Sequence, residues 1–321
     1  MQDLVLEGYG DTSLDCLPSI NAGVQDDTAR FEPGRRAMTA VQLGPVGIWS
    51  MELRFGDPAL GNEVAAELDE LGYGALWIPG GIDDAVLGDI DRLLSATRTI
   101  ALATGIINIW KQQPEDVAAW WKGQPAERQS RVMLGLGVSH APIIGENWGK
   151  PLALMRDYVD RLDAAGLPPS ASCLAALGPK MLELAGKRTA GAHPYLVTPE
   201  HSAIAREVMG PSKLVAPEQG VVVESDPGKA RELARAALDH YRFLPNYKNN
   251  WLRLGFSEDD VDNLSDRLID GLFAWGSPEK IAERVKAHHD AGADHVCLQV
   301  VSGGDFAKTR ADYRELAAAV L

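Results

Sequence analysis

The chain has 321 residues, with 31 Lys and Arg against 45 Asp and Glu, so its formal net charge is −14. An acidic chain without a basic block is not expected to bind nucleic acid or an anionic membrane. It has no apolar run of the roughly 18 residues that span a membrane, and no signal-peptide pattern at its start. Three widely spaced cysteines indicate neither a disulfide framework nor a zinc motif. We therefore expect a soluble, cytoplasmic protein.

The first 37 residues differ in composition from the rest. Glu7–Arg36 is rich in Gly, Asp, Pro, Ser and Thr and has no helical or strand periodicity. Because Met38 directly precedes the first convincing strand, Met1–Ala37 is either an arm that packs on the body or a segment foreign to the native protein. We expect an N-terminal extension over residues 1–37 and a single domain over residues 38–321.

From Val41 onward, short apolar runs alternate with amphipathic stretches. Continuous apolar runs without strict alternation are typical of parallel strands that are covered on both faces. The eight runs are Val41–Ile48, Ala75–Ile78, Thr99–Thr104, Arg131–Val138, Ser172–Ala176, Ala192–Val197, Lys213–Val223 and His295–Val301.

Helices are predicted between these runs. Asn62–Leu71 carries one apolar stripe, and Gly72 and Gly292 stand where a helix needs a left-handed end. Several helices begin with proline at the first position, where its missing N–H costs no hydrogen bond. These prolines are Pro58, Pro114, Pro199, Pro227 and Pro278.

Eight β/α units predict an α/β fold of the (β/α)8 TIM-barrel type. A doubly wound sheet is the alternative, and it requires a glycine-rich phosphate loop after its first strand. The segment Gly44–Trp49 does not have the GxGxxG pattern of such a loop. The widest gap lies between strands seven and eight, where Tyr241–Trp275 forms an aromatic insertion that could roof a pocket.

The carboxyl ends of barrel strands are where an active site is expected. The first strand ends at Trp49, the third in Thr104–Asn108, and the fourth in Ser139 and His140. After strand five, Gly178 precedes Pro179 and Lys180 at a helix start, which indicates a phosphate cradle of backbone amides and one positive charge. An ordinary strand-to-helix turn is the alternative for this segment, and core packing is the alternative for Trp49.

His140 is the one histidine at a strand end facing the expected mouth. His193 and His295 lie inside apolar runs and are expected in the core. The histidines on predicted helices are expected on solvated faces: His201, His240, His288 and His289. No histidine pair has metal-binding spacing and no GxSxG motif occurs. We therefore expect no metal ion and no serine-hydrolase chemistry.

In this order, several segments resemble the bacterial luciferase-like superfamily, and within it the branch of oxidoreductases that depend on the deazaflavin coenzyme F420. The segments are GYGALWIPG, TRTIALATGIINIW, RVMLGLGVSH, AALGPKMLELAGKRTAGAHPYLVTPEH and AGADHVCLQV, within about Val41 to Gly304. The resemblance implies a (β/α)8 barrel with an insertion between strands seven and eight, a homodimer, and a cis peptide between Gly105 and Ile106. That peptide would support the middle ring of the deazaflavin.

The resemblance also implies which residues serve the site. His140 is the predicted catalytic residue, in a pocket it shares with Ser139. Two departures from relatives bear on this assignment: Pro79-Gly80-Gly81 stands where many carry Asp-His, and His140 stands where many carry Glu. The predicted cofactor-binding residues are Trp49, Thr104, Gly105, Ile106, Asn108, Ser139, Gly178, Pro179 and Lys180.

Three functions are consistent with these observations. The first is hydride transfer between coenzyme F420 and a small organic substrate. The second is an FMN-dependent luciferase-like monooxygenase with a separate reductase, since a deazaflavin does not form the required oxygen adduct. The third is a non-catalytic protein that binds a flavin or deazaflavin, which the absence of Asp-His favours.

Overall fold

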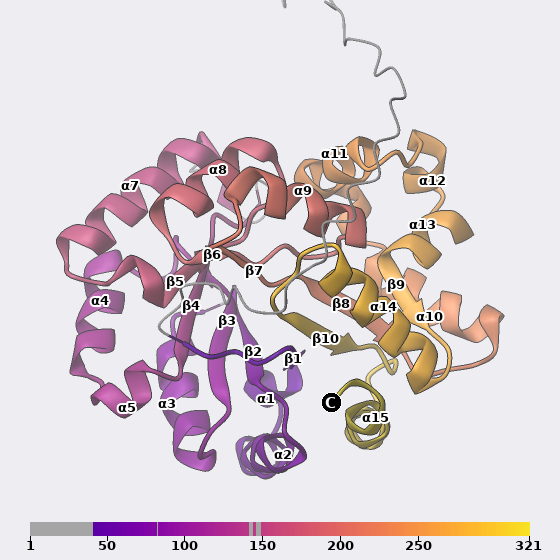
Figure 1. Cartoon of the computed structure of the whole chain (residues 1–321), viewed down its shortest axis with the longest axis horizontal. Helices are drawn as coiled ribbons and strands as arrows, with labels where there is room; N and C mark the ends of the chain where they lie inside the picture. The colour runs from indigo at the N-terminus through magenta and orange to yellow at the C-terminus, as the bar shows by residue number, and fades with distance from the viewer. Residues whose placement is uncertain (1–40, 82, 141–143, 146–148) are drawn as a thin grey trace, which may run out of the picture. The chain divides into compact units, whose positions relative to one another are not determined.

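The computed structural model describes residues 41–81, 83–140, 144–145 and 149–321. Its strands form one parallel sheet in the order β7-β6-β5-β4-β3-β2-β1-β10-β8-β9 (Figure 1). The boundary expected between residues 37 and 38 lies outside the described residues. The strands are β1 Val46–Trp49, β2 Ala75–Gly80, β3 Ala101–Asn108, β4 Val132–Gly137, β5 Ser172–Leu174, β6 Gly191–Ala192, β7 Leu214–Val215, β8 Glu218–Val222, β9 Phe273–Trp275 and β10 Val296–Val300.

The sheet closes on itself because β7 and β8 are two parts of the seventh predicted strand. Val215 pairs with Ala192 of β6, and its carbonyl also accepts a hydrogen bond of 2.9 Å from the backbone N–H of Asp294. The N–H of Cys297 in β10 donates to the carbonyl of Pro217 at 3.0 Å. One run of chain therefore joins both neighbours, and β9 pairs with β8 in addition. The predicted (β/α)8 barrel is confirmed.

Helices follow the strands around this barrel, and none that the structure describes is long and apolar enough to cross a membrane. All five predicted proline starts are confirmed, as are the left-handed glycines at Gly72 (φ 97°) and Gly292 (φ 98°). The helices are α1 Glu52–Phe55, α2 Pro58–Leu71, α3 Val86–Ala96, α4 Pro114–Gly123, α5 Ala126–Gln129, α7 Pro151–Ala164, α8 Pro179–Arg188, α9 Pro199–Met209, α10 Pro227–Leu238, α11 Pro245–Arg253, α12 Glu258–Asp262, α13 Asp266–Leu272, α14 Pro278–Asp290 and α15 Phe306–Val320, with 3₁₀ turns η2 Pro169–Ala171 and η3 Tyr241–Phe243.

The predicted insertion, Tyr241–Trp275, contains η3, α11, α12, α13 and β9. It has its own apolar cluster, centred on the fully buried Trp251 of α11. The indole N–H of Trp251 donates to the carbonyl of Leu196, in the segment after β6, at 3.0 Å. The insertion is thus fastened to the chain at the carboxyl end of strand six.

Buried aromatic rings fill the barrel interior between the strands. Trp77 of β2 stacks on His193 with 4.1 Å between ring centroids, and its indole N–H donates to Nε2 of His295 at 3.0 Å. Both histidines are core residues, as predicted. The expectation of solvated faces is wrong for His201 and His288, which are buried and bonded to the carbonyl of Leu177 and the side chain of Gln219.

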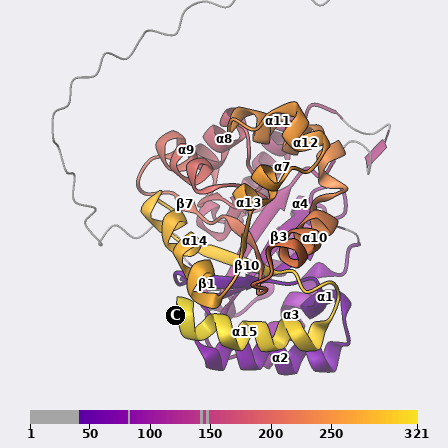
Figure 2. The same cartoon turned by 90° about the vertical axis from the view of Figure 1, so that its right-hand side faces the viewer.

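The last helix, α15, lies beside α2 (Figure 2). Arg310 of α15 forms ion pairs with Glu63 and Glu67 of α2, and Arg314 adds a second contact to Glu67. Helices from the two ends of the described barrel are therefore held together by charge as well as by packing.

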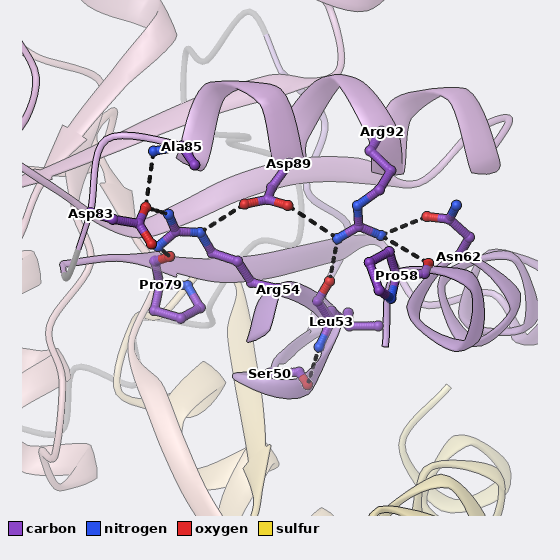
Figure 3. A network of polar contacts seen from close by, with 10 residues as sticks. All are labelled: Ser50, Leu53, Arg54, Pro58, Asn62, Pro79, Asp83, Ala85, Asp89 and Arg92. Atoms are coloured by element: carbon purple, nitrogen blue, oxygen red, sulfur yellow. Dashed lines mark hydrogen bonds and ion pairs between the residues drawn. The ribbon is translucent and has the colours of Figure 1, made fainter. Parts of the chain in front are cut away.

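A buried arginine holds the loop after β2. Arg54 of α1, with 1% of its side chain exposed, donates to the carbonyl of Pro79 at 2.7 Å and to Asp89 of α3 at 3.0 Å, and it pairs with Asp83 (Figure 3). Arg92 extends the network by donating to the carbonyl of Leu53 at 2.6 Å. The loop after β2 is thus fixed by a guanidinium group from α1.

We expect Arg54→Met to lower the free energy of unfolding by about 2–3 kcal/mol, because the buried Pro79 carbonyl would lose its donor and Asp89 would keep only Arg92 as a partner. Chemical denaturation measures the change. Arg98→Met is the control, since the Arg98–Glu70 pair is exposed and its loss should cost less than about 0.5 kcal/mol. Equal losses in the two variants would contradict a special role for Arg54.

Candidate active site

The ends of β1, β3 and β4 meet at the predicted cis peptide. The bond between Gly105 and Ile106 is cis, and the indole N–H of Trp49 donates to the carbonyl of Gly105 at 3.2 Å. A Cβ at Gly105 would lie 2.4 Å from Trp49 Nε1 and 2.9 Å from His193 Nε2. Gly137 is equally restricted, because its Cβ would lie 2.5 Å from the Ile106 side chain. The glycines therefore allow Trp49 and Ile106 to occupy this end of the barrel.

Thr104 and Asn108 are fully buried, and their side chains are bonded to the backbone. The Thr104 hydroxyl donates to the carbonyl of Gly135 at 2.9 Å. The amide of Asn108 donates to the carbonyl of Gly81 at 3.1 Å and accepts from the N–H of Trp110 at 3.1 Å. These two predicted cofactor-binding side chains fix the shape of the strand ends.

Ser139 and His140 follow β4 at the mouth. Ser139 has a left-handed backbone with φ 62°, and His140 is half-buried with its ring centroid 5.6 Å from that of Tyr247. Nδ1 of His140 has no hydrogen-bond partner within the described residues. Burial lowers the pKa of His140 below its ordinary value, and contact with Asn246 opposes the shift. The imidazole is therefore mainly neutral at pH 7.

Three tyrosines connect the two sides of the mouth, and we call them the tyrosine cluster: Tyr195 after β6, Tyr241 in η3 and Tyr247 in α11. The hydroxyl of Tyr195 donates to Gln299 Oε1 of β10 at 2.7 Å and lies 3.4 Å from that of Tyr241. Tyr195 also lies over Trp49, with 5.8 Å between ring centroids. Sequence reasoning missed these residues, although the aromatic composition of the insertion was a signal.

A second group of residues, which we call the anion cradle, surrounds the start of α8 and comprises Gly178, His201, Asn250 and Arg253. Gly178 begins α8 without a side-chain cap, and a Cβ there would lie 3.7 Å from the guanidinium group of Arg253. Arg253 donates to the side chain of Asn250 at 3.2 Å. His201 Nδ1 and Asn250 Nδ2 are buried and have no hydrogen-bond partner among the residues described.

The cradle contains one of the predicted phosphate residues, Gly178, and adds three that the prediction lacked. Pro179 and Lys180, the other predicted members, are exposed on the first turn of α8. The N-terminus of a helix, an arginine and the unbonded buried amide nitrogen of Asn250 favour an anion at this place. In the part of the chain that the structure describes, no group of three or more His, Cys, Asp and Glu side chains is placed to hold a metal ion.

The family model described as luciferase-like monooxygenase matches residues 168–295. None of the curated proteins matches the chain. Among solved structures, an F420-dependent secondary alcohol dehydrogenase in complex with an F420-acetone adduct is similar, with a TM-score of 0.66, 16% identity and coverage of 87% of this chain and 99% of that one.

Two further structures have the same fold. The coenzyme F420 dependent tetrahydromethanopterin reductase from Methanopyrus kandleri has a TM-score of 0.60 at 14% identity, covering 88% of this chain and 99% of that one. The oxygenating constituent of 3,6-diketocamphane monooxygenase from Pseudomonas putida, in complex with FMN, has a TM-score of 0.60 at 14% identity, covering 87% and 99%. The resemblance identified in the sequence is therefore confirmed. The luciferase-like monooxygenase model matches part of the chain, and the whole barrel has the fold of the structures named above.

Proposed function

We propose that the protein transfers a hydride between coenzyme F420 and a small organic substrate, with an alcohol and its ketone as the preferred pair. The anion cradle is the observation that carries the proposal, because a phosphate would accept a hydrogen bond from the buried amide Nδ2 of Asn250, which otherwise has no partner among the described residues. The similar fold of the F420-dependent alcohol dehydrogenase supports the choice of cofactor and substrate class.

The residues present fit a phosphate-bearing deazaflavin. Gly178 and the following amides of α8 would hold the phosphate together with Arg253, and the peptide between Gly105 and Ile106 would support the ring system. When bound, the cofactor would supply hydride transfer at its central ring. Trp49 holds the Gly105 carbonyl in place and thereby fixes the surface on which the ring would rest.

His140 is the proposed acid–base residue. A neutral imidazole with an unbonded Nδ1 can accept the hydroxyl proton of an alcohol as the alcohol is oxidised, and return it in the reverse direction. In the loop after β2, Asp83 is paired with Arg54 and Asp84 is exposed to solvent, which leaves His140 as the proposed acid–base group. The expected homodimer and cytoplasmic location remain predictions.

A reductase-dependent FMN monooxygenase is the second candidate. Its support is the family match and the fold shared with the FMN-containing oxygenating constituent. The anion cradle serves the phosphate of either cofactor, so the preference between the two ring systems decides between the functions.

We expect purified protein, stripped of ligand, to bind F420 with a Kd in the micromolar range, about 8 kcal/mol of binding free energy, and FMN at least about tenfold more weakly. Fluorescence or calorimetric titration with each cofactor measures the preference. Tighter binding of FMN would favour the monooxygenase, and binding of neither would contradict both candidates.

Arg253→Ala should weaken F420 binding about 10- to 100-fold, because a charge-assisted hydrogen bond contributes about 1.5–3 kcal/mol. Lys180→Ala is the matched control, since this exposed lysine at the start of α8 should change affinity by less than about threefold. A larger effect at Lys180 than at Arg253 would show that the phosphate lies at the outer turn of the helix.

His140→Ala should lower turnover of an alcohol substrate by about 100-fold or more while leaving F420 affinity within about threefold. Because the pKa of His140 is lowered, wild-type alcohol oxidation should stay level as pH falls to about 6.5 and decline only below it. Steady-state rates from pH 5 to 8 measure both effects. Turnover within about threefold of wild type in the variant would exclude His140 as the acid–base group.

A further inference from the structure

One leucine between β6 and α9 adopts a conformation that leucine rarely takes. Leu196 has φ 54°, and it lies within Tyr195–Thr198, which we call the strand-six strap. Its N–H donates to Oε2 of Glu218 in β8 at 3.0 Å, and its carbonyl accepts from Trp251 Nε1 at 3.0 Å. Both partners are fully buried. The left-handed turn is therefore held from the barrel wall on one side and from the insertion on the other.

The strap connects the two halves of the mouth. At one end, the hydroxyl of Tyr195 is bonded to Gln299 in the tyrosine cluster. At the other end, Thr198 directly precedes α9, and His201 in the first turn of α9, a member of the anion cradle, donates to the carbonyl of Leu177 at 2.9 Å. A change of backbone direction at Leu196 would consequently move Tyr195, Thr198 or both.

Glu218 is an unusual residue to hold such a turn. Its side chain is fully buried, and Oε1 has no hydrogen-bond partner in the described part of the chain. The titratable groups that face it are Tyr195, Cys297 of β10, Tyr241 of η3 and Tyr247 of α11. Burial raises the pKa of all four, so they are neutral at pH 7 and none supplies a positive charge.

We propose that Glu218 is a positioning residue of the site and that, as a neutral acid, it holds the strand-six strap in the conformation that serves both the tyrosine cluster and the anion cradle. The inference rests on the proposed function for the ligands involved. The bond from the Leu196 N–H, the full burial of the carboxyl group and its unpaired Oε1 are the observations that carry it.

The neutral state makes the strap sensitive to pH. Burial raises the pKa of Glu218 to about 8, whereas a carboxyl hydrated by opening of the strap would titrate near its ordinary value, about 4.5. The open form therefore loses its proton first as pH rises. The equilibrium constant for opening should rise by up to about tenfold per pH unit between these two values. Above the higher value it should stay constant.

Hydrogen–deuterium exchange at the Leu196 amide tests this directly, without any cofactor. After correction for intrinsic exchange, wild-type protection should fall between pH 5 and pH 8. Glu218→Gln keeps a carbonyl acceptor and removes the titration, so its protection should be independent of pH. Glu218→Ala should be unprotected throughout, and Glu207→Gln, at an exposed acid of α9, should behave like wild type.

Affinity for F420 and FMN, measured at pH 6 and pH 8.5, tests the link to the ligands. We expect Glu218→Ala to bind the preferred cofactor at least about tenfold more weakly, and Glu218→Gln to bind like wild type at pH 6 and better than wild type at pH 8.5. Flat wild-type protection, or a Gln variant with the wild-type pH profile, would overturn the role of Glu218. If the wild type binds neither F420 nor FMN, the proposed function is overturned instead. The exchange result would still decide whether Glu218 holds the strap.

Discussion

The interior of the closed barrel has room for few large side chains, and this limited volume decides what reaches the mouth. Alternate residues of each strand point inward, so a bulky ring from one strand requires a small residue on its neighbour. Trp49 can lie against β3 only because residue 105 is glycine, and Gly135 leaves space for the carbonyl of Thr104, which a Cβ would approach to 2.0 Å. These glycines therefore determine the shape of the strand ends as much as the large side chains do.

Much of the fold follows from local patterns in the sequence. The apolar runs located the strands because both faces of a parallel sheet are covered, and proline at the first turn located helix starts because its missing N–H has no partner there in any helix. The seventh run was predicted as one strand and is divided at Ala216 and Pro217, since proline cannot donate to the sheet. The family-specific peptide at Gly105 was predicted by resemblance, and no local pattern indicates it.

The site was less predictable because its members come from distant parts of the chain. Arg253 and Asn250 lie in the insertion, and only folding brings them to Gly178. His201 and His288 have the sequence context of surface residues, yet the packing of α9 and α14 buries them. Asn108 lies at a strand end where a ligand was expected, but its amide is bonded to Gly81 and Trp110, a partner choice that depends on loop geometry.

Several helices that begin with proline and follow a strand share a direction, and this direction has an electrostatic consequence. They are α4, α7, α8, α9 and α10. Each of these helices follows a strand, so its partly positive N-terminus lies toward the carboxyl end of the barrel, although the whole chain has a net charge of −14. An anion in solution therefore meets a repulsive field at long range and an attractive one only within about one helical turn. Salt that screens the first field would leave the second largely intact, so the proposed anion would be bound by fit at close range rather than by attraction from a distance.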